Sequence, residues 1–517
     1  MELCTVGEEI MTKKIVVIGG GSAGWLTALY IKKEYPDLDL TVVESKEIGI
    51  LGAGEGTTPR LIEFLETLDI PLSDIVKNCD ATIKNGIKFT NWNNDGKFYY
   101  HGFALKGPTL LGFDAESQDL FSRPLVLSSI IKNNSHSDVD FIEKISELNK
   151  VPFTYKEHTV DELDSHHDKL GLHAIHFDAA KFAARLKQIG IDRNIKIIEK
   201  TITDISVNQK NNVDKILFDD ATQIECDFVF DCSGFHRLII GKIFDAKWKS
   251  YGDFLPSDSA LPFFTDVEND IPPYTEAIAM KYGWMWKIPL QSRFGCGYVY
   301  DSSLISEDEA AQEIEEFLGY TPTYPRKGKG AFKFSAGCYE ETWVNNCVAI
   351  GLAANFIEPL EATSIWISIN MLRRLLTNPE WLFDDVSCIR DEFNKDVLSM
   401  NNDMSEFIYF HYMSQRKDTD FWKKFTYEKA PESLKQRLNL WKQRFPTKND
   451  GGPYWASDSW LIVGLGIDVI SKHVARRYID NSKKYNDFFN KYYHYLARQN
   501  SKRDDCMDHR QFLESLK

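Results

Sequence analysis

The sequence contains no apolar run close to the roughly 20 residues that a helix needs to cross a bilayer, so no membrane span is expected. It also contains no block of basic residues, and its formal net charge is -15, because 61 Lys and Arg face 76 Asp and Glu. Nucleic acid and anionic membranes are therefore not expected partners.

Features of secreted and metal-binding proteins are missing as well. Residues 1–12 lack the apolar core and small-residue cleavage pattern of a signal peptide. The nine cysteines are scattered along the chain without a CxxC pair. We therefore expect reduced thiols, a cytoplasmic location and no metal site.

What the sequence does contain is a strand, turn and helix pattern at residues 13–33. The β-branched run Ile15–Ile18 predicts a buried parallel strand, and Gly19, Gly21 and Gly24 follow it in a GxGxxG pattern. These glycines permit a tight turn, close approach of a pyrophosphate and packing of helix on strand. Glu44 ends the next strand, where a ribose-binding carboxylate is found in dinucleotide-binding folds. The pattern predicts dinucleotide binding but does not separate FAD from NAD.

Two further strands are expected to end at glycine turns. They are Cys226–Gly234 and Asn345–Phe356, and the second leads into a helix expected from Thr363 to Leu376. A β-rich layer is expected over 260–300. The runs 83–90 and 97–103, separated by Asn-Asn-Asp-Gly, predict a β-hairpin. These patterns indicate one sheet built from distant pieces of sequence, with an additional β layer.

Several motifs resemble those of flavin-dependent halogenases of the tryptophan halogenase family. They are GGGSAG at 19–24, KNGIKF at 84–89, WMWKIP at 284–289, which fits WxWxIP, and GLAANFIEPLEATSI at 351–365. The resemblance spans about residues 13–370, and the most specific part is WxWxIP together with the Glu361 segment. Beyond it, the chain resembles the family only in its helical, aromatic character.

The resemblance implies an α/β fold. Its parts are an FAD-binding doubly wound domain like that of flavin monooxygenases, a β-rich substrate layer and a mostly helical C-terminal region. We expect residues 1–385 to form the FAD-binding and halogenation module and residues 386–517 to close the substrate site. The expected cofactor-binding residues are Gly19, Gly21, Ser22, Ala23, Gly24, Glu44, Leu352 and Ile365. Only one GxGxxG unit is visible, so we expect FAD to arrive as FADH2 from a separate flavin reductase.

Trp284 and Trp286 lie two residues apart, so on a strand they share one face. Core packing of an aromatic pair is one interpretation. The resemblance implies another, in which the pair forms a wall that keeps organic substrate away from the reduced flavin.

Lys84 and Glu361 also have two interpretations each. Lys84 has the position of an ordinary surface lysine near a turn, and Glu361 that of a carboxylate favoured at a helix start. The resemblance implies that both are catalytic. Lys84 would hold hypohalous acid or form a haloamine, and Glu361 would act where the arene loses its proton.

The resemblance extends to the halide and the substrate. Thr363 and Ser364 begin the long helix, whose free N–H groups suit an anion, and the family places halide there. His101 and Phe103 resemble a segment flanking the indole pocket, although a hairpin histidine and a core phenylalanine explain them equally well. Tyr454, Trp455 and Trp460 cannot be aligned to known substrate contacts, so free tryptophan is not fixed as the substrate.

The predicted function is therefore FADH2-dependent halogenation. It would use O2 and chloride, bromide or iodide, by way of a flavin hydroperoxide and hypohalous acid, on an electron-rich arene such as tryptophan or another indole. An FAD-dependent aromatic monooxygenase is one alternative, but it does not explain WxWxIP together with Lys84 and Glu361. A non-catalytic flavin-binding redox protein is the other, and it needs no halide site. The oligomeric state stays open, a homo-oligomer included.

Overall fold

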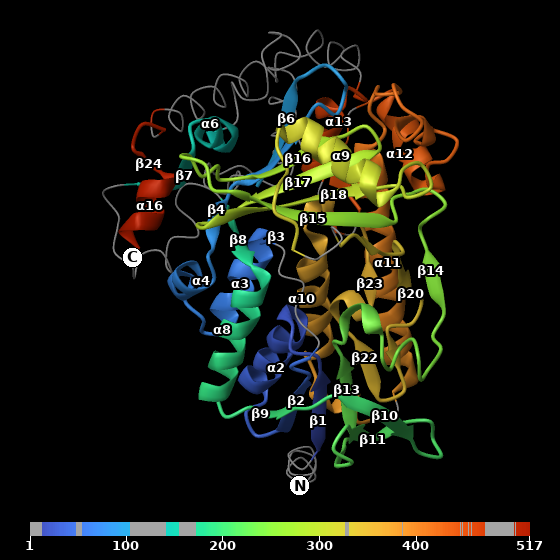
Figure 1. Ribbon diagram of the computed structural model, residues 1–517. Helices are drawn as coiled ribbons and strands as arrows, with labels where there is room; N and C mark the ends of the chain where they lie inside the picture. The colour runs from blue at the N-terminus through green and yellow to red at the C-terminus, as the bar shows by residue number, and fades with distance from the viewer. Residues whose placement is uncertain are drawn as a thin grey trace, which may run out of the picture.

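The computed structural model describes residues 13–47, 54–103, 141–154, 172–325, 330–384, 386–444, 446, 448–452, 454–455, 457–470, 501 and 503–516. Figure 1 shows a sheet with helices at the N-terminal end of the molecule and a second sheet at the opposite end. Two long helices, α10 (Thr363–Leu375) and α11 (Ser387–His411), run between these sheets (Figure 1). The molecule thus has an α/β architecture.

The first sheet has six strands, in the order β21-β22-β13-β1-β2-β9. Its strands are β21 (Trp343–Val344), β22 (Cys347–Ala349), β13 (Phe228–Asp231), β1 (Lys14–Ile18), β2 (Asp39–Glu44) and β9 (Lys196–Glu199). All neighbours are parallel except β21 and β22. β1 is buried along its β-branched run, as expected for a central parallel strand. The prediction of one sheet built from distant pieces of sequence is confirmed.

The second sheet has seven strands, in the order β19-β15-β18-β17-β16-β5-β6. They are β19 (Phe332–Lys333), β15 (Ser259–Asp266), β18 (Arg293–Tyr300), β17 (Gly283–Pro289), β16 (Thr275–Ala279), β5 (Gly86–Thr90) and β6 (Phe98–Gly102). This confirms the expected β-rich layer. The predicted hairpin is also present, since β5 and β6 are antiparallel from Gly86 opposite Gly102 to Thr90 opposite Phe98.

One expected strand is divided. The run 83–90 is interrupted at Asn85, whose N–H donates to the Pro273 carbonyl. Residues before the break form β4 (Thr82–Lys84), which pairs with β8 (Ala174–Asp178) instead of entering the hairpin sheet. β8 also pairs with β3 (Gly54–Gly56). Lys84 therefore lies in a small three-stranded sheet between the two large ones.

The remaining strands form small sheets. They are β10 (Ile202–Val207), β11 (Val213–Phe218) and β12 (Gln223–Glu225); β14 (Trp248–Ser250), β20 (Gly337–Tyr339) and β23 (Asn355–Phe356); and β7 (Lys150–Thr154) with β24 (Cys506–Asp508).

The other α-helices cover these sheets or form the C-terminal region. They are α2 (Ser22–Glu34), α3 (Pro59–Thr67), α4 (Leu72–Asn78), α6 (Phe141–Glu147), α8 (Ala179–Asp192), α9 (Glu307–Leu318), α12 (Glu432–Trp441), α13 (Ser457–Gly466) and α16 (His509–Ser515). The predicted helix at 363–376 is confirmed by α10, which begins at Thr363.

Two observations bear on the expectations drawn from composition. Within the described ranges, no helix has both the length and the apolar character needed to cross a membrane. The eight cysteines of the described residues are all free thiols, and every one except Cys388 is buried.

Candidate functional site

A cavity of about 760 Å³ opens where the three predicted glycine turns meet. Gly19, Gly234 and Gly351, each just beyond a strand of the parallel sheet, all line it. The chain passes from β1 to β2 on one side and continues later to β13 on the other. The cavity thus lies at the reversal of strand order, where open α/β sheets bind their ligands.

The first glycine turn has the shape that a dinucleotide requires. Gly19 has a φ of 119°, which a residue with a side chain rarely adopts. A Cβ on Gly24 would lie 1.9 Å from the Gly19 carbonyl oxygen, so helix α2 packs closely on β1 only with glycine there. Gly21 faces open space within the cavity lining, together with Ser22 and Ala23. The residues present fit a pyrophosphate at the start of α2.

Glu44 lies at the end of β2 and lines the same cavity. Its carboxylate pairs with Lys187 of α8, which also pairs with Glu199. A Cβ on Gly20 would lie 1.9 Å from Glu44 Oε2, so the glycine makes room for this carboxylate. The ribose contact predicted for Glu44 stays a prediction.

The N-terminus of α10 faces the cavity as well. Ala362, with a φ of 54°, precedes the helix, and no side chain caps its first turn. Thr363, Ser364 and Ile365 line the cavity, as does Leu352 from the Gly351 turn. Uncapped N–H groups at a helix start favour an anion, so the geometry is compatible with the predicted halide position.

Trp284 and Trp286 lie on one face of β17 and both line the cavity. Their ring centroids are 6.3 Å apart. A Cβ on Gly297, in the neighbouring strand, would lie 2.0 Å from the Trp286 ring, so glycine is needed for that ring's position. Trp284 Nε1 donates to Glu358 Oε2 over 3.0 Å. The pair is packed in the core, and it also lines the cavity, while its role as a barrier to the substrate stays a prediction.

Lys84 is buried, with 1% of its surface exposed, and it lines the cavity from β4. Its Nζ donates to the Thr57 carbonyl over 2.9 Å and lies 5.6 Å from the centroid of the Phe103 ring. Burial lowers the pKa of Lys84 to about 8, although the charge of Glu361 raises it. The interpretation of Lys84 as a surface lysine is wrong, because the strand is interrupted at Asn85 and β4 pairs with β8, where Lys84 is buried.

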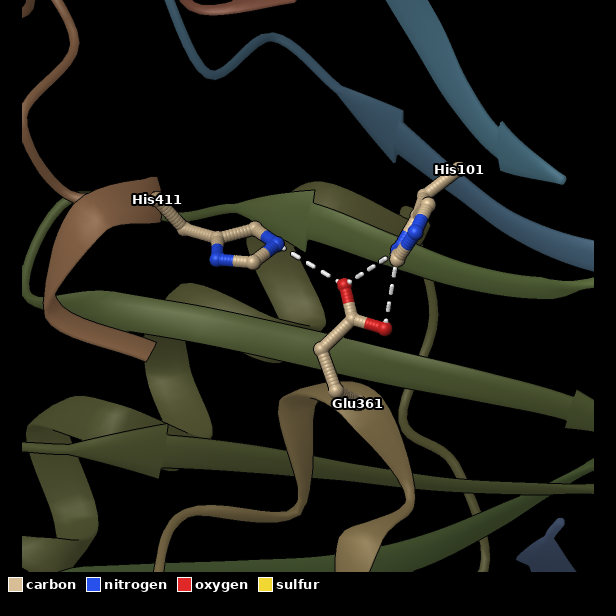
Figure 2. Close-up of side chains that lie close together, drawn as sticks. All are labelled: His101, Glu361 and His411. Carbon is tan, nitrogen blue, oxygen red and sulfur yellow. Dashed lines mark hydrogen bonds and ion pairs between the residues drawn. The ribbon is translucent and has the colours of Figure 1, made fainter. Parts of the chain in front are cut away.

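Glu361 ends a short 3-10 helix, η5 (Pro359–Glu361), and is 4% exposed. Figure 2 shows its carboxylate between His101 of β6 and His411 at the end of α11. His101 Nδ1 lies 2.9 and 3.0 Å from the two carboxylate oxygens, and His411 Nε2 lies 2.8 Å from Oε1. Burial alone would raise the pKa of Glu361, but the charges and hydrogen bonds of the two histidines outweigh it and lower the pKa to about 2.

The second ring nitrogen of His411 decides how the protons are placed. Nδ1 lies 2.8 Å from the Phe407 carbonyl, which can only accept, so Nδ1 carries a proton. Nε2 faces the carboxylate of Glu361, which also accepts when ionised. His411 therefore satisfies both contacts as the imidazolium, and its charge stabilises the Glu361 carboxylate.

Sequence reasoning identified His101 and Glu361 but missed His411. His411 lies outside the recognised motifs, and only the packing of α11 brings it to the site. In the described part of the chain, these three residues have the spacing of a possible metal site, since their ligand atoms lie within 4.8 Å of one another. The hydrogen bonds among them account for that closeness without a metal ion.

Aromatic side chains from the C-terminal region surround this cluster. The Trp455 ring stacks on Phe407 at 4.2 Å between centroids and lies 5.9 Å from the His101 ring. Trp460 meets Phe407 edge-on at 4.8 Å. Trp455, which could not be aligned from sequence, therefore lies next to His101, and Trp460 reaches the cluster only through Phe407.

Comparisons with known proteins agree with this geometry. A family model described as tryptophan halogenase matches residues 14–482. The chain is 31% identical to the 7-chloro-L-tryptophan 6-halogenase KtzR of Kutzneria sp. (strain 744) over 464 residues, covering 85% of this chain and 87% of that protein.

Solved structures give the same result. The tryptophan 6-halogenase SttH from Streptomyces toxytricini superposes with a TM-score of 0.84 at 26% identity, over 98% of this chain and 100% of that one. The flavin-dependent halogenase Xcc4156 from Xanthomonas campestris also gives a TM-score of 0.84, at 28% identity over 98% of both chains.

Proposed function

The chain belongs to the tryptophan halogenase family of flavin-dependent enzymes, and from that premise we propose that it halogenates an electron-rich arene using FADH2, O2 and halide. The proposed halide is chloride, bromide or iodide, and the proposed arene is tryptophan or another indole. The specific substrate and halide are part of the proposal, since one relative is named as a 7-chloro-L-tryptophan halogenase and another as a tryptophan halogenase.

One observation carries this proposal. Lys84 lines the cavity formed by the glycine turns, and it is also close enough to Glu361 for that charge to raise its pKa. It therefore connects the cavity proposed for the cofactor with the buried carboxylate, which is not part of the cavity lining. A flavoprotein that only stores electrons has no need of such a connection.

The cavity is the proposed FAD site, in a doubly wound domain of the flavin monooxygenase type. Gly19, Gly21 and Gly24 would hold the pyrophosphate, and Glu44 the ribose. With reduced FAD held there, supplied by a separate flavin reductase, O2 would take two electrons from the flavin and two from halide, so that halide becomes hypohalous acid and the second oxygen atom leaves as water. Leu352 and Ile365 would contact the cofactor from the opposite wall.

The chain's own residues then have distinct proposed roles. The uncapped N–H groups at Thr363 and Ser364 would hold the halide, since they suit an anion. Trp284 and Trp286 would exclude the arene from the cofactor side. Lys84 would receive the hypohalous acid through its N–H groups. Glu361 would stabilise the positive charge that develops on the arene and accept its proton.

Residues 386–517 would close the arene site over the module formed by residues 1–385. α11 contributes His411 and Phe407 to the surroundings of Glu361, and Trp455 stacks on Phe407. His101, in β6, and Phe103, just after that strand, would face the same arene. This division is a functional proposal and concerns the described residues of both parts.

The test is reconstitution with FAD, a flavin reductase, NADH, O2 and either bromide or chloride, using a panel of indoles and tryptophan. Mass spectrometry should show substitution of hydrogen by halogen. A product heavier by one oxygen atom would instead indicate a monooxygenase. The absence of product from every arene would leave only the redox-protein alternative.

Lys84→Ala provides the sharpest control. We expect loss of arene halogenation below detection while oxidation of reduced flavin continues, because Lys84 lies at the far end of the proposed oxidant path. Lys88→Ala is the matched substitution, since Lys88 pairs with Glu147 and does not line the cavity. Halogenation by Lys84→Ala at the rate of Lys88→Ala would contradict the proposed role.

A further inference from the structure

The strand that carries Lys84, β4, lies at the edge of its sheet. In the order β3-β8-β4 it comes last, and it pairs with β8 through Ile83 opposite Ile175 and Lys84 opposite Ala174. An edge strand directs some of its N–H and C=O groups away from the sheet, and these need other partners when they are buried. Ile83 has no exposed surface, so a partner for its N–H must come from another part of the fold.

That partner is His509, at the start of the C-terminal helix α16. The Ile83 N–H donates to His509 Nε2 over 3.0 Å, although the two residues are 426 positions apart. The other ring nitrogen, Nδ1, lies 2.8 Å from the carbonyl of Ile271, in the segment before β16. The ring is fully buried. It therefore bridges β4 and the segment that leads into the neighbouring sheet.

The two contacts assign one protonation state to His509. A backbone N–H can only donate, so Nε2 accepts from Ile83 and carries no proton. A backbone carbonyl can only accept, so Nδ1 carries the proton and donates to Ile271. Burial lowers the pKa of His509 to about 4, which keeps the ring neutral at pH 7. The ring is thus a fixed acceptor for the edge of β4.

The helix that carries this ring has anchors of its own. The strand before it, β24, pairs with β7. The Phe512 ring stacks on Phe153, with 4.7 Å between centroids. Arg510 donates to the carbonyls of Glu268 and Asn269, each over 2.7 Å. The ring therefore projects from an element that is held in place without it, and its hydrogen bond ties β4 to that element.

The position of β4 determines where the Lys84 side chain lies. Lys84 follows Ile83 directly, and successive residues of a strand point to opposite faces, so Ile83 packs in the core while Lys84 lines the cavity. Lys84 Nζ donates to the Thr57 carbonyl over 2.9 Å. A shift of Ile83 moves Lys84 with it, and a misplacement of 1 Å at a reacting group can cost about 10² in rate.

We propose that His509 is a positioning residue, whose ring holds the edge of β4 so that Lys84 reaches the cavity at one defined place. The inference rests on the proposed function for the role of Lys84. It gives the C-terminal helix a part in the reaction, although that helix lies beyond residues 14–482, which the family model matches.

Two substitutions of His509 separate its two contacts. The side-chain carbonyl of His509→Gln occupies the place of Nε2 and keeps the acceptor for Ile83. The side-chain amide of His509→Asn occupies the place of Nδ1 and keeps the donor for Ile271. Each variant keeps one hydrogen bond and loses the other, so a general loss of stability affects both. They differ in whether the strand of Lys84 is held.

The first test measures halogenated arene formed per flavin oxidised. In His509→Asn this ratio should fall roughly tenfold, the order expected when a buried donor is left without a partner. In His509→Gln it should stay within about twofold of the wild type, because one neutral acceptor replaces another. Arg510→Met removes contacts of α16 that do not involve β4 and should also keep the ratio. Equal ratios in His509→Asn and His509→Gln would overturn the inference.

The second test needs neither cofactor nor turnover. Hydrogen exchange of the Ile83 amide, resolved by mass spectrometry of fragments, should be slow in the wild type and in His509→Gln. It should be roughly tenfold faster in His509→Asn. In the unaltered protein, 15N NMR of labelled histidine should find His509 at pH 7 with a proton on Nδ1 and none on Nε2. The opposite tautomer, or equal exchange in the two variants, would overturn the inference.

The two tests separate the possible failures. A wild-type protein that makes no halogenated arene overturns the proposed function, and the exchange experiment still decides whether His509 holds β4. A protein that halogenates normally, but whose Ile83 amide exchanges equally in both variants, overturns the inference alone.

Discussion

Glu358 and Glu361 lie at the two ends of one short turn, yet their surroundings shift their pKa values in opposite directions. Glu358 has no exposed surface and Glu361 has 4%. Burial raises the pKa of Glu358 to about 7, while its neighbours lower the pKa of Glu361 to about 2 despite the same burial. The difference between them lies in their partners, since both are removed from water.

Glu358 receives hydrogen bonds from neutral groups, the Trp284 indole N–H and the Tyr412 hydroxyl. Glu361 is held by two histidines, one of which satisfies its contacts as a cation. Neutral donors hold a carboxyl group in place without repaying the cost of burying a charge, whereas a cation repays it. One turn thus provides an anchor for the tryptophan wall and, three residues later, a carboxylate that stays ionised beside Lys84.

Glu361→Gln and Glu358→Gln make the same chemical change on the two sides of this comparison. Glu361→Gln should lower the rate of arene halogenation by roughly 10² to 10⁴, because it removes both the stabilising charge and the proton acceptor. Glu358→Gln should lower it by less than about tenfold, since an amide oxygen still accepts from neutral donors. Halogenation rates under saturating flavin reductase and arene provide the measurement.

Similar decreases in the halogenation rate of the two variants would contradict this difference, because they would mean that the reaction needs the charge of Glu358 as well. Oxidation of reduced flavin serves as the control in both proteins. It should continue in Glu361→Gln, since Glu361 does not line the cavity proposed for the cofactor.

The residues that the sequence located are those whose signal is local. Gly19, Gly21 and Gly24 follow a β-branched strand, and Thr363 begins a helix as expected, because turn and helix chemistry act over a few neighbouring residues. Motif resemblance singled out Lys84 and Glu361, which the structure finds buried and electrostatically coupled.

The residues that sequence reasoning missed acquire their positions through contacts distant in the chain. His411 meets Glu361 only because α11 packs beside α10, and nothing in the local pattern of 407–411 indicates a charged ring. The interruption of the strand at Asn85, just after Lys84, likewise involves a distant contact, since the Asn85 N–H donates to the Pro273 carbonyl.

Removing His411 should make the surroundings of Glu361 more similar to those of Glu358. In His411→Phe the carboxylate keeps His101 but loses the hydrogen bond and charge of His411, so the pKa of Glu361 should rise from its value of about 2. Halogenation that needs the ionised carboxylate should then lose activity at a higher pH on the acid side. We expect about a tenfold lower rate at neutral pH and an acid limb shifted upward, measured from a pH–rate profile.

His411→Gln keeps a neutral N–H donor toward Glu361 and should recover part of the loss, while the acid limb stays shifted. An acid limb at the wild-type position in both variants would show that His411 does not keep Glu361 ionised.

The smallest expected effect concerns Glu358 and appears in stability. Its pKa is about 7 in the folded protein, against 4.5 for an unperturbed glutamate. Below the lower value both states are protonated and the group contributes nothing. As pH rises from 4.5 to 7, the unfolded state ionises first, so the free energy of unfolding falls, and above 7 the full cost of burial is present.

Glu358→Gln cannot ionise and should escape this cost. Its free energy of unfolding relative to the wild type should therefore rise by about 2 kcal/mol between pH 5 and pH 8, measured by denaturant unfolding. Burial also raises the pKa of Glu55 to about 7, but both proteins carry it, so its contribution cancels in the difference. The Ser257 hydroxyl, which contributes to the pKa of Glu358, is a neutral partner for the amide group. Parallel stability curves across this range would mean that Glu358 is ionised in the fold, as Glu361 is, and the contrast between the two ends of the turn would then disappear.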